Sequence, residues 1–375
     1  MSNATFAYTY SFTNRAYPFT YFVDSTSWVY PLSGSGLYYY MANGNYDSDS
    51  SDYNQASPGA FIGALTSDLQ KTVDGTGRAN LVVYIHGLGN TYSDGIAGAA
   101  NLGANLQAAG YGGLVVGFSW PSYSMLVAPF ASYYATAYPP ANTSGTIRDN
   151  INGSVAGFLA MLAQLQSIKV NNNPVNISVI CHSEGNFMLL WGMSQYPRTS
   201  PPMNHAIMLA ADISAAMLQT GQKGSGITAN FKDVNVYFSG ADADVTYSNY
   251  EFFDYHFKAY PSRLGLVGPF SYPSQGGVPK NVTGIDCSQV TIDLGGIQYV
   301  HSSYMSLPST IADMDSVLTN SQPKGRTLYP GSSSPWYYLN AGQAVPAGIV
   351  DLWSRQTPHA PTLRAGSILG NRVCY

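Results

Sequence analysis

Residues Val179-Ile180-Cys181-His182-Ser183-Glu184-Gly185-Asn186 change abruptly from a strand pattern to a helix pattern. Strand-forming residues run from Ile177 to Cys181, and a helix-like segment, Phe187 to Tyr196, begins directly after the turn. A sharp strand-to-helix turn with a serine at its tip exposes that serine as a nucleophile. The match to the pattern G-x-S-x-G is imperfect, because Cys181 stands at the first glycine position. We therefore predict a nucleophile elbow whose role depends on the rest of the chain.

Further apolar strands lie on both sides of this turn, and helix patterns such as 97–109 and 151–166 separate them. These strands are Leu81 to Ile85, Leu114 to Phe118, Ala206 to Ala211 and Val234 to Phe238. Apolar strands that alternate with helices predict an α/β fold with a mostly parallel sheet covered on both faces. Ligands bind such sheets beyond the carboxyl ends of the strands. The polar residues that fall at those ends are His86, Ser183, Asp212, Asp242 and Asp244.

A serine hydroxyl needs an adjacent base, and the base needs an orienting acid. In α/β-hydrolases these residues follow one another along the chain as serine, acid and histidine. Ser183, Asp242 and His301 satisfy that order, so we expect His301 to take the Ser183 proton and Asp242 to orient His301. Asp244, two residues further on, and Asp212, after the preceding strand, remain alternative acids.

The same residues also have structural interpretations. Ser183 could cap the helix that follows it, and His301 could be a loop histidine that caps the last helix. We favour the catalytic interpretation because strand, turn and helix agree at Ser183. His182 lies in the elbow, and we expect its side chain to point elsewhere. The remaining histidines outside the strand ends fit the role of base less well: His205, His256 and His359.

An oxyanion hole needs two backbone N–H groups aimed at the developing charge. We expect one from Glu184, the residue after the nucleophile, and one from Leu88, in the loop after the strand that ends at His86. His86 is expected to brace that loop. The Glu184 side chain could bind loop backbone or tune the pH dependence, and the structural role is favoured.

The amino-acid composition limits the classes of protein to which this chain can belong. Charged residues make up 10% of the 375 residues, and tyrosine occurs 30 times. Low charge with many hydroxyl and amide groups favours a secreted protein, although the first residues carry no signal pattern. The net charge of −4 gives no electrostatic case for nucleic acid or anionic membrane, and no apolar run reaches the about 20 residues of a membrane span. We find no dinucleotide, phosphate-loop or metal-binding motif, so no cofactor and no metal are expected.

Several short motifs resemble the bacterial α/β-hydrolase branch that is catalogued only as of unknown function. That branch shows a His-Gly-aromatic-Asn loop, a Phe-Ser-Trp-Pro strand end and an Ala-His-Ser-Met-Gly-Asn elbow. The matching motifs here are Val83-Tyr84-Ile85-His86-Gly87-Leu88-Gly89-Asn90, Phe118-Ser119-Trp120-Pro121-Ser122, Cys181-His182-Ser183-Glu184-Gly185-Asn186, Ser239-Gly240-Ala241-Asp242, Arg263-Leu264-Gly265, Ile285-Asp286 and His301-Ser302-Ser303-Tyr304.

The resemblance covers about residues 80–318. It implies the α/β-hydrolase fold and a triad of Ser183, Asp242 and His301, and it favours Asp242 over Asp244. It implies no particular substrate. This chain departs from the branch at Cys181, at Glu184 and at Leu88, which replaces the aromatic residue of the loop.

We expect one domain over residues 1–375. Its parts are N-terminal strands at 1–55 as a possible antiparallel edge of the sheet, a catalytic core at 80–318, an apolar-aromatic insertion at 122–146, a long connection at 245–300, and an extension at 320–375 packed on the core. The insertion could be a lid or could pack on its own core. A disulfide between Cys287 and Cys374 would tie down the C-terminal tail.

The triad alone suffices for acyl transfer to water, so carboxylic esters are the first expectation. The aromatic segments at 123–138 and 247–260 favour hydrophobic acyl or aromatic substrates, including lipids or polyesters. A serine peptidase or amidase is the alternative enzyme, because this fold serves both reactions. The third hypothesis is a non-catalytic binding protein built on the same fold. We therefore expect a small-molecule or polymeric ester as the partner, and no nucleic acid.

Overall fold

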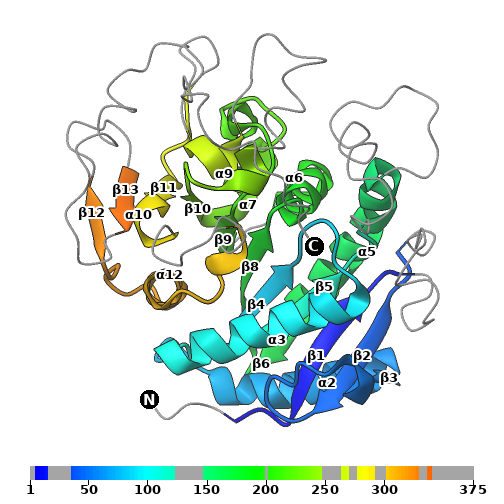
Figure 1. The fold of residues 1–375 in the computed structure, drawn as a ribbon. Coiled ribbons are helices and arrows are strands. Elements are labelled where there is room, and N and C mark those ends of the chain that lie inside the picture. Colours follow the sequence, from blue (N-terminus) through cyan, green and yellow to red (C-terminus); the bar gives the residue numbers. More distant parts are fainter. Residues whose placement is uncertain are drawn as a thin grey trace.

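The structure, a computed structural model, describes residues 5–15, 35–122, 147–198, 202–246, 263–269, 277–291, 301–328 and 336–339. Its centre is an 11-stranded sheet in the order β12-β13-β11-β10-β9-β8-β4-β5-β1-β2-β3 (Figure 1). These strands are β1 (Tyr8–Thr13), β2 (Tyr38–Asn43), β3 (Asn54–Ala56), β4 (Asn80–Ile85), β5 (Leu114–Ser119), β8 (Asn176–His182), β9 (Met203–Leu209), β10 (Phe231–Phe238), β11 (Val282–Asp286), β12 (Arg326–Leu328) and β13 (Trp336–Leu339). A separate hairpin pairs β6 (Lys169–Val170) with β7 (Asn173–Pro174).

The helices are α2 (Pro58–Leu69), α3 (Tyr92–Ala109), α5 (Ile147–Ser167), α6 (Gly185–Gln195), α7 (Ser225–Asn230), α9 (Leu264–Val267), α10 (Ser288–Thr291) and α12 (Pro308–Leu318). Short 3-10 turns add η1 (Ser50–Asp52), η2 (Gln70–Thr72) and η3 (Ala215–Leu218). No helix within these described parts combines the length and apolarity needed to cross a bilayer.

Neighbouring strands from β13 across to β1 run parallel, whereas β2 and β3 at one edge and β12 at the other are antiparallel. The central strands β5 and β9 are buried along their whole length, which explains their largely apolar sequences. The predicted α/β fold with a mostly parallel sheet is thereby confirmed. The N-terminal edge is only partly antiparallel, because β1 pairs parallel with β5.

Helices cover both faces of the sheet (Figure 1). Along β5, a side chain at Gly117 would meet Ala99 of α3, whereas Phe118 packs against Phe158 of α5. Because successive strand residues point to opposite faces, α3 and α5 lie on opposite sides of the sheet. Helix α12 packs with α3, and α6 packs with α5 and α7.

Local capping explains where two helices begin. Ser57 accepts a hydrogen bond from the Ala60 N–H, and Pro58 follows at the first position of α2, as the sequence predicts. Helix α3 begins at Tyr92 rather than at residue 97, because Thr91 and Asp94 form a reciprocal capping box. The predicted boundary was wrong because the first turn, Tyr92-Ser93-Asp94-Gly95, is mostly polar and shows no apolar periodicity.

Two late segments contribute more than the sequence indicated. The connection at 245–300 contains β11, which pairs with β10 in the sheet. Within the extension at 320–375, β13 pairs parallel with β11 and β12 closes that edge. The sequence analysis expected a long connection and an extension packed on the core, and it identified neither β11 nor the strands β12 and β13 within them. The predicted lid insertion from residue 123 to 146, the aromatic loop at 247–260 and Cys374 lie outside the described residues.

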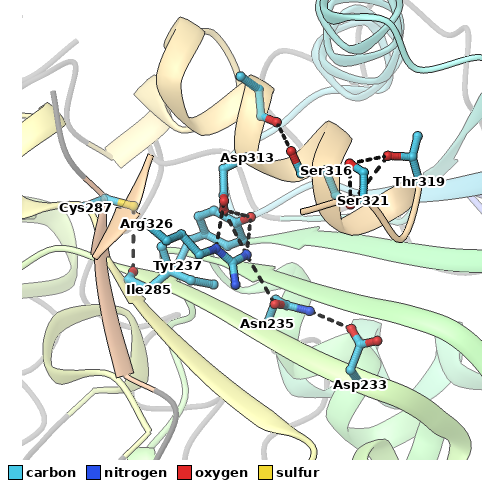
Figure 2. A network of polar contacts seen from close by, with 11 residues as sticks. Asp233, Asn235, Tyr237, Ile285, Cys287, Asp313, Ser316, Thr319, Ser321 and Arg326 are labelled. Atoms are coloured by element: carbon cyan, nitrogen blue, oxygen red, sulfur yellow. Dashed lines mark hydrogen bonds and ion pairs between the residues drawn. The ribbon is translucent and has the colours of Figure 1, made fainter. Parts of the chain in front are cut away.

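A buried polar network joins α12 and β12 to β10 (Figure 2). Arg326 Nε and Nη2 donate to the two carboxylate oxygens of Asp313 at 2.7 and 2.9 Å. The Tyr237 hydroxyl donates to Asp313 Oδ2 at 2.6 Å, and Arg326 also reaches Tyr237 and Asn235 at 3.4 Å. The Asp313 side chain is fully buried and that of Arg326 is 6% exposed. The network thus fastens the helix that follows His301 to the strand that precedes Asp242.

Candidate active site

Ser183 occupies a sharp turn between β8 and α6. Its φ of +52° lies in the left-handed region, which costs a serine roughly 1–3 kcal/mol and persists only when neighbours fix it. The Ser183 N–H donates to the Leu209 carbonyl at 3.0 Å, so β9 holds the turn from one side. The fully buried Asn186 amide donates to the carbonyls of Ser183 at 2.9 Å and Leu209 at 3.2 Å. The turn is therefore held by the next strand and by the first turn of α6.

Two glycines allow the close packing of this turn. A Cβ on Gly185 would lie 2.6 Å from the Ile85 carbonyl oxygen, and a Cβ on Gly87 would lie 2.7 Å from the Ser183 Cβ. Cys181, in contrast, lies inside β8, where it pairs with Ile85 and Met208 and is fully buried. The first position of the motif is thus an ordinary core strand position here. Burial raises the pKa of the Cys181 thiol.

His301 and Asp242 are in direct hydrogen-bonding contact. His301 Nδ1 lies 2.9 Å from Asp242 Oδ2 and 3.1 Å from Oδ1, and the Asp242 side chain is fully buried. The Val245 N–H also donates to Asp242 Oδ1 at 3.1 Å, which fixes the carboxylate. Burial disfavours the charged imidazolium, but Asp242, with Asp244 and Asp212 farther away, outweighs that effect and raises the pKa of His301 above 6.5.

The two alternative acids lie in other arrangements. Asp212 Oδ1 forms a buried ion pair with Arg263 Nε at 3.2 Å. Arg263 comes from the Arg-Leu-Gly segment, which the sequence analysis quoted without giving it a role. Asp244 is exposed. Among the described residues, only Asp242 hydrogen-bonds the His301 ring, so the geometry favours Asp242 as the orienting acid.

His86 braces the loop that follows β4, as expected. Its Nδ1 lies 2.9 Å from the Gly87 carbonyl, and its Nε2 accepts from the Trp120 N–H at 3.2 Å. The Trp120 indole donates back to the His86 carbonyl at 2.8 Å and stacks on the imidazole. Burial, followed by the positive charge of Arg15, lowers the pKa of His86 to about 3, so the ring is neutral.

The same loop is held by three further side chains. The Asn90 amide donates to the Leu88 carbonyl at 3.0 Å, and the Ser122 hydroxyl donates to the Asn90 carbonyl at 2.7 Å. Arg15, at the end of β1 and 1% exposed, donates to that carbonyl from Nη2 at 2.8 Å and to the Ser119 hydroxyl from Nε at 3.1 Å. Arg15 was not among the predicted site residues. Its only signal in the sequence was an arginine two residues after an aromatic-rich strand.

The two residues predicted to form an oxyanion hole flank the turn. Leu88 is partly buried in the braced loop, and none of the hydrogen bonds between described residues uses its N–H. Glu184 immediately precedes α6 and is 2% exposed. The loop at 86–87 packs directly against Ser183, so both backbone segments lie beside its side chain.

The expectation that His182 points away from the site was wrong. His182 Nε2 lies 2.7 Å from the backbone carbonyl oxygen of His301, and the two imidazole centroids are 4.7 Å apart. The structure thus brings together residues 182 and 301, which are far apart in sequence. No periodicity in the sequence could reveal this contact.

Comparison with solved structures finds α/β hydrolases at low sequence identity. The dienelactone hydrolase of Anabaena variabilis is 14% identical over 62% of this chain and 86% of its own, with a TM-score of 0.32. Aspergillus fumigatus lipase B is 14% identical over 66% of this chain and 54% of its own, with a TM-score of 0.34. A hormone-sensitive lipase from a metagenome library is 8% identical over 77% and 84%, with a TM-score of 0.34.

None of the curated proteins compared with this chain matches it in sequence. The profile of one family, described as "Alpha/beta hydrolase of unknown function (DUF900)", matches residues 62–319. This range contains the elbow, the braced loop, Asp242 and His301, and it agrees with the resemblance drawn from the motifs. The chain therefore belongs to this family of α/β hydrolases of unknown function.

Proposed function

We propose that this protein is a serine hydrolase that cleaves carboxylic esters through an acyl-enzyme intermediate. Ser183 is the nucleophile, His301 the general base and Asp242 the orienting acid. The observation that carries the proposal is the paired contact of His301 Nδ1 with both Asp242 oxygens, in a chain whose β8 leads into a serine with left-handed backbone. This geometry leaves the other nitrogen of the His301 ring available to accept a proton.

The proposed reaction has two halves. His301 Nε2 takes the proton of the Ser183 hydroxyl while Oγ attacks the ester carbonyl carbon, and the resulting imidazolium is stabilised by Asp242. The same proton then passes to the departing alcohol as the C–O bond breaks, which leaves an acyl group on Ser183. Water attacks this acyl group and gives a proton to His301. The bond between the acyl carbon and Ser183 Oγ then breaks, Oγ takes the proton back from His301, and the carboxylic acid leaves.

Backbone N–H groups of Leu88 and Glu184 are proposed to stabilise the oxyanion in both halves. The bracing of the loop by His86, Asn90 and Arg15 supports this assignment, because a preorganised donor needs no rearrangement during the reaction. Rigid positioning of Glu184 follows from its place at the start of α6.

The proposed substrates are esters with hydrophobic acyl or aromatic groups. This part of the proposal rests on the aromatic sequences at 123–138 and 247–260, which lie outside the described residues. Lipids and polyesters fall within the class.

The test is a reaction with p-nitrophenyl esters of increasing acyl length, together with labelling by a fluorophosphonate probe. We expect turnover and labelling in the wild-type protein and loss of both in Ser183→Ala. A matched control is Ser194→Ala, which changes an exposed serine on the same helix and keeps activity. Absence of labelling and turnover in the wild type would overturn the proposal. Faster cleavage of peptides or anilides than of esters would identify an amidase instead.

A further inference from the structure

The residue before the proposed nucleophile contacts the proposed base. His182 Nε2 lies 2.7 Å from the carbonyl oxygen of His301, and the rings meet at an interplanar angle of 57°. The His182 side chain is buried, with 6% exposure. The last residue of β8, His182, therefore touches residue 301, and Ser183 follows it directly in the chain.

The chemistry of this contact defines the protonation of His182. A carbonyl oxygen only accepts hydrogen bonds, so Nε2 of His182 must carry a hydrogen. Burial, together with the charge of the neighbouring His301, lowers the pKa of His182 to about 3. At neutral pH the ring is therefore a neutral donor that neither supplies nor removes a proton in catalysis.

His301 begins the described segment 301–328. Residues 301–303 are helical, and a turn at 304–306 leads to α12. The N–H groups of Met305 and Leu307 bond to the carbonyls of Ser302 and Ser303, and the His301 carbonyl accepts a hydrogen bond from the side chain of His182. The hydrogen bond from His182 thus joins the His301 backbone to the strand that leads into Ser183.

We propose that His182 is a positioning residue: its hydrogen bond to the His301 carbonyl, and the packing of the two rings, hold the base between Ser183 and Asp242. The inference rests on the proposed function of Ser183 and His301. Three carboxylates act on His301: Asp242 in direct contact, and Asp244 and Asp212 from farther away. The neutral ring of His182 also packs against His301.

The experiment compares three substitutions at this position. His182→Leu removes the donor, His182→Gln keeps an N–H at a similar distance from Cα, and His182→Asn has a donor that is too short to reach. The matched control is His205→Leu, since His205 is also a buried strand histidine but pairs with Asp233, in the neighbouring strand β10. For each variant we would measure kcat, KM and the pH profile of kcat/KM, in particular the fall at low pH that forms its acidic limb. We would also record the downfield proton resonance of the bond from His301 Nδ1 to Asp242.

We expect kcat of His182→Leu to fall by up to about 100-fold, the size that follows from a small misplacement of a reacting group. KM stays unchanged. The acidic limb moves to lower pH, because a displaced His301 loses part of its stabilisation by Asp242, and the downfield resonance broadens or disappears. His182→Gln restores these properties. His205→Leu lowers the free energy of unfolding without changing the acidic limb of the kcat/KM profile. If His182→Leu does not fold, the contrast between His182→Gln and His182→Asn gives the same test.

The outcomes separate this inference from the proposed function. Wild-type kcat, limb and resonance in His182→Leu, combined with an inactive Ser183→Ala, would overturn the role of His182 and leave the triad in place. Equal losses in His182→Gln and His182→Leu would also overturn it. A wild-type protein without Ser183-dependent turnover would overturn the proposed function, and this inference with it.

Discussion

At the scale of single residues, the polar side chains at the carboxyl edge of the sheet are divided among distinct partners. Asp242 contacts His301, whereas Asp212 contacts Arg263 in a buried ion pair. A buried carboxylate already paired with a guanidinium gains little by turning to a histidine. Asp212 and Asp242 follow neighbouring strands. The pairing of Asp212 with Arg263, which lies more than fifty residues away in sequence, favours Asp242 as the partner of His301.

Amide substitutions at the two aspartates should separate their roles. Asp242→Asn is expected to lower kcat by roughly 10⁴-fold with little loss of stability, because an amide no longer holds the productive tautomer of His301. Asp212→Asn is expected to lower the free energy of unfolding by about 3 kcal/mol or more, because Arg263 would remain buried without its counter-charge. Ester kinetics and urea unfolding check both. The acid is misassigned if Asp212→Asn, while still folded, loses the activity and Asp242→Asn keeps it.

The raised pKa of His301 predicts the direction of the pH dependence. His301 acts as a base only when neutral, so kcat/KM should fall as the pH drops through a value above 6.5. The ion pair with Asp242 stabilises the fold fully below the unfolded-state value of 6.5, and this contribution is lost as the pH rises through the folded-state pKa. A pH profile of kcat/KM tests the first statement. An acidic limb below 6.5 in the wild type would contradict it.

At the scale of elements, the elbow depends on how closely α6 approaches β4. Gly185→Ala would place a Cβ 2.6 Å from the Ile85 carbonyl oxygen and 2.7 Å from that of His86. We expect a loss of about 1–3 kcal/mol in the free energy of unfolding, and a displaced Ser183, because backbone must move. Gly63→Ala, an exposed position in α2 with no atom near the new methyl group, should instead gain roughly 0.5–1 kcal/mol. Equal stability changes in the two variants would contradict this account.

The elements that the sequence predicted correctly are those with a strong local signal. Strands β4, β5, β8, β9 and β10 each contain a largely apolar stretch, and α2 carries a capping serine and a proline. β11 includes Gly284, and β13 has only four residues. β11 pairs with β10, and β13 pairs with β11. Such long-range pairing leaves no local pattern in the sequence.

The candidate site was predictable to a similar extent. Ser183, Asp242 and His301 follow from the order of residues after strands, and the contact between His301 and Asp242 agrees with that prediction. Their catalytic roles stay proposals. Arg15 and His182 were missed as contributors because each acts through a backbone carbonyl distant in sequence, Asn90 for Arg15 and His301 for His182. A carbonyl is present in every residue, so sequence gives no sign of such a partner.

At the scale of the whole molecule, the network around Arg326 connects one edge of the sheet to the helix after His301 (Figure 2). Arg326→Leu should lower the free energy of unfolding by about 3–5 kcal/mol, because Asp313 would remain buried without a counter-charge. Lys324→Ala, which removes a mostly exposed partner of Asp315, should cost less than about 1 kcal/mol. Denaturant titrations of both variants measure the difference. Similar losses would show that Arg326 is not a buried anchor.

The range matched by the family profile is narrower than the sheet itself. Residues 62–319 leave out β1, β2 and β3 at one end and β12 and β13 at the other. A polypeptide trimmed to that range would present β5 and β11 as unprotected edges, and buried apolar strands with unpaired backbone groups invite chain-to-chain pairing. It would also lack Arg15 and the counter-charge of Asp313. The flanking strands are in this sense built-in protection against aggregation, and expression work on this chain should retain both of them.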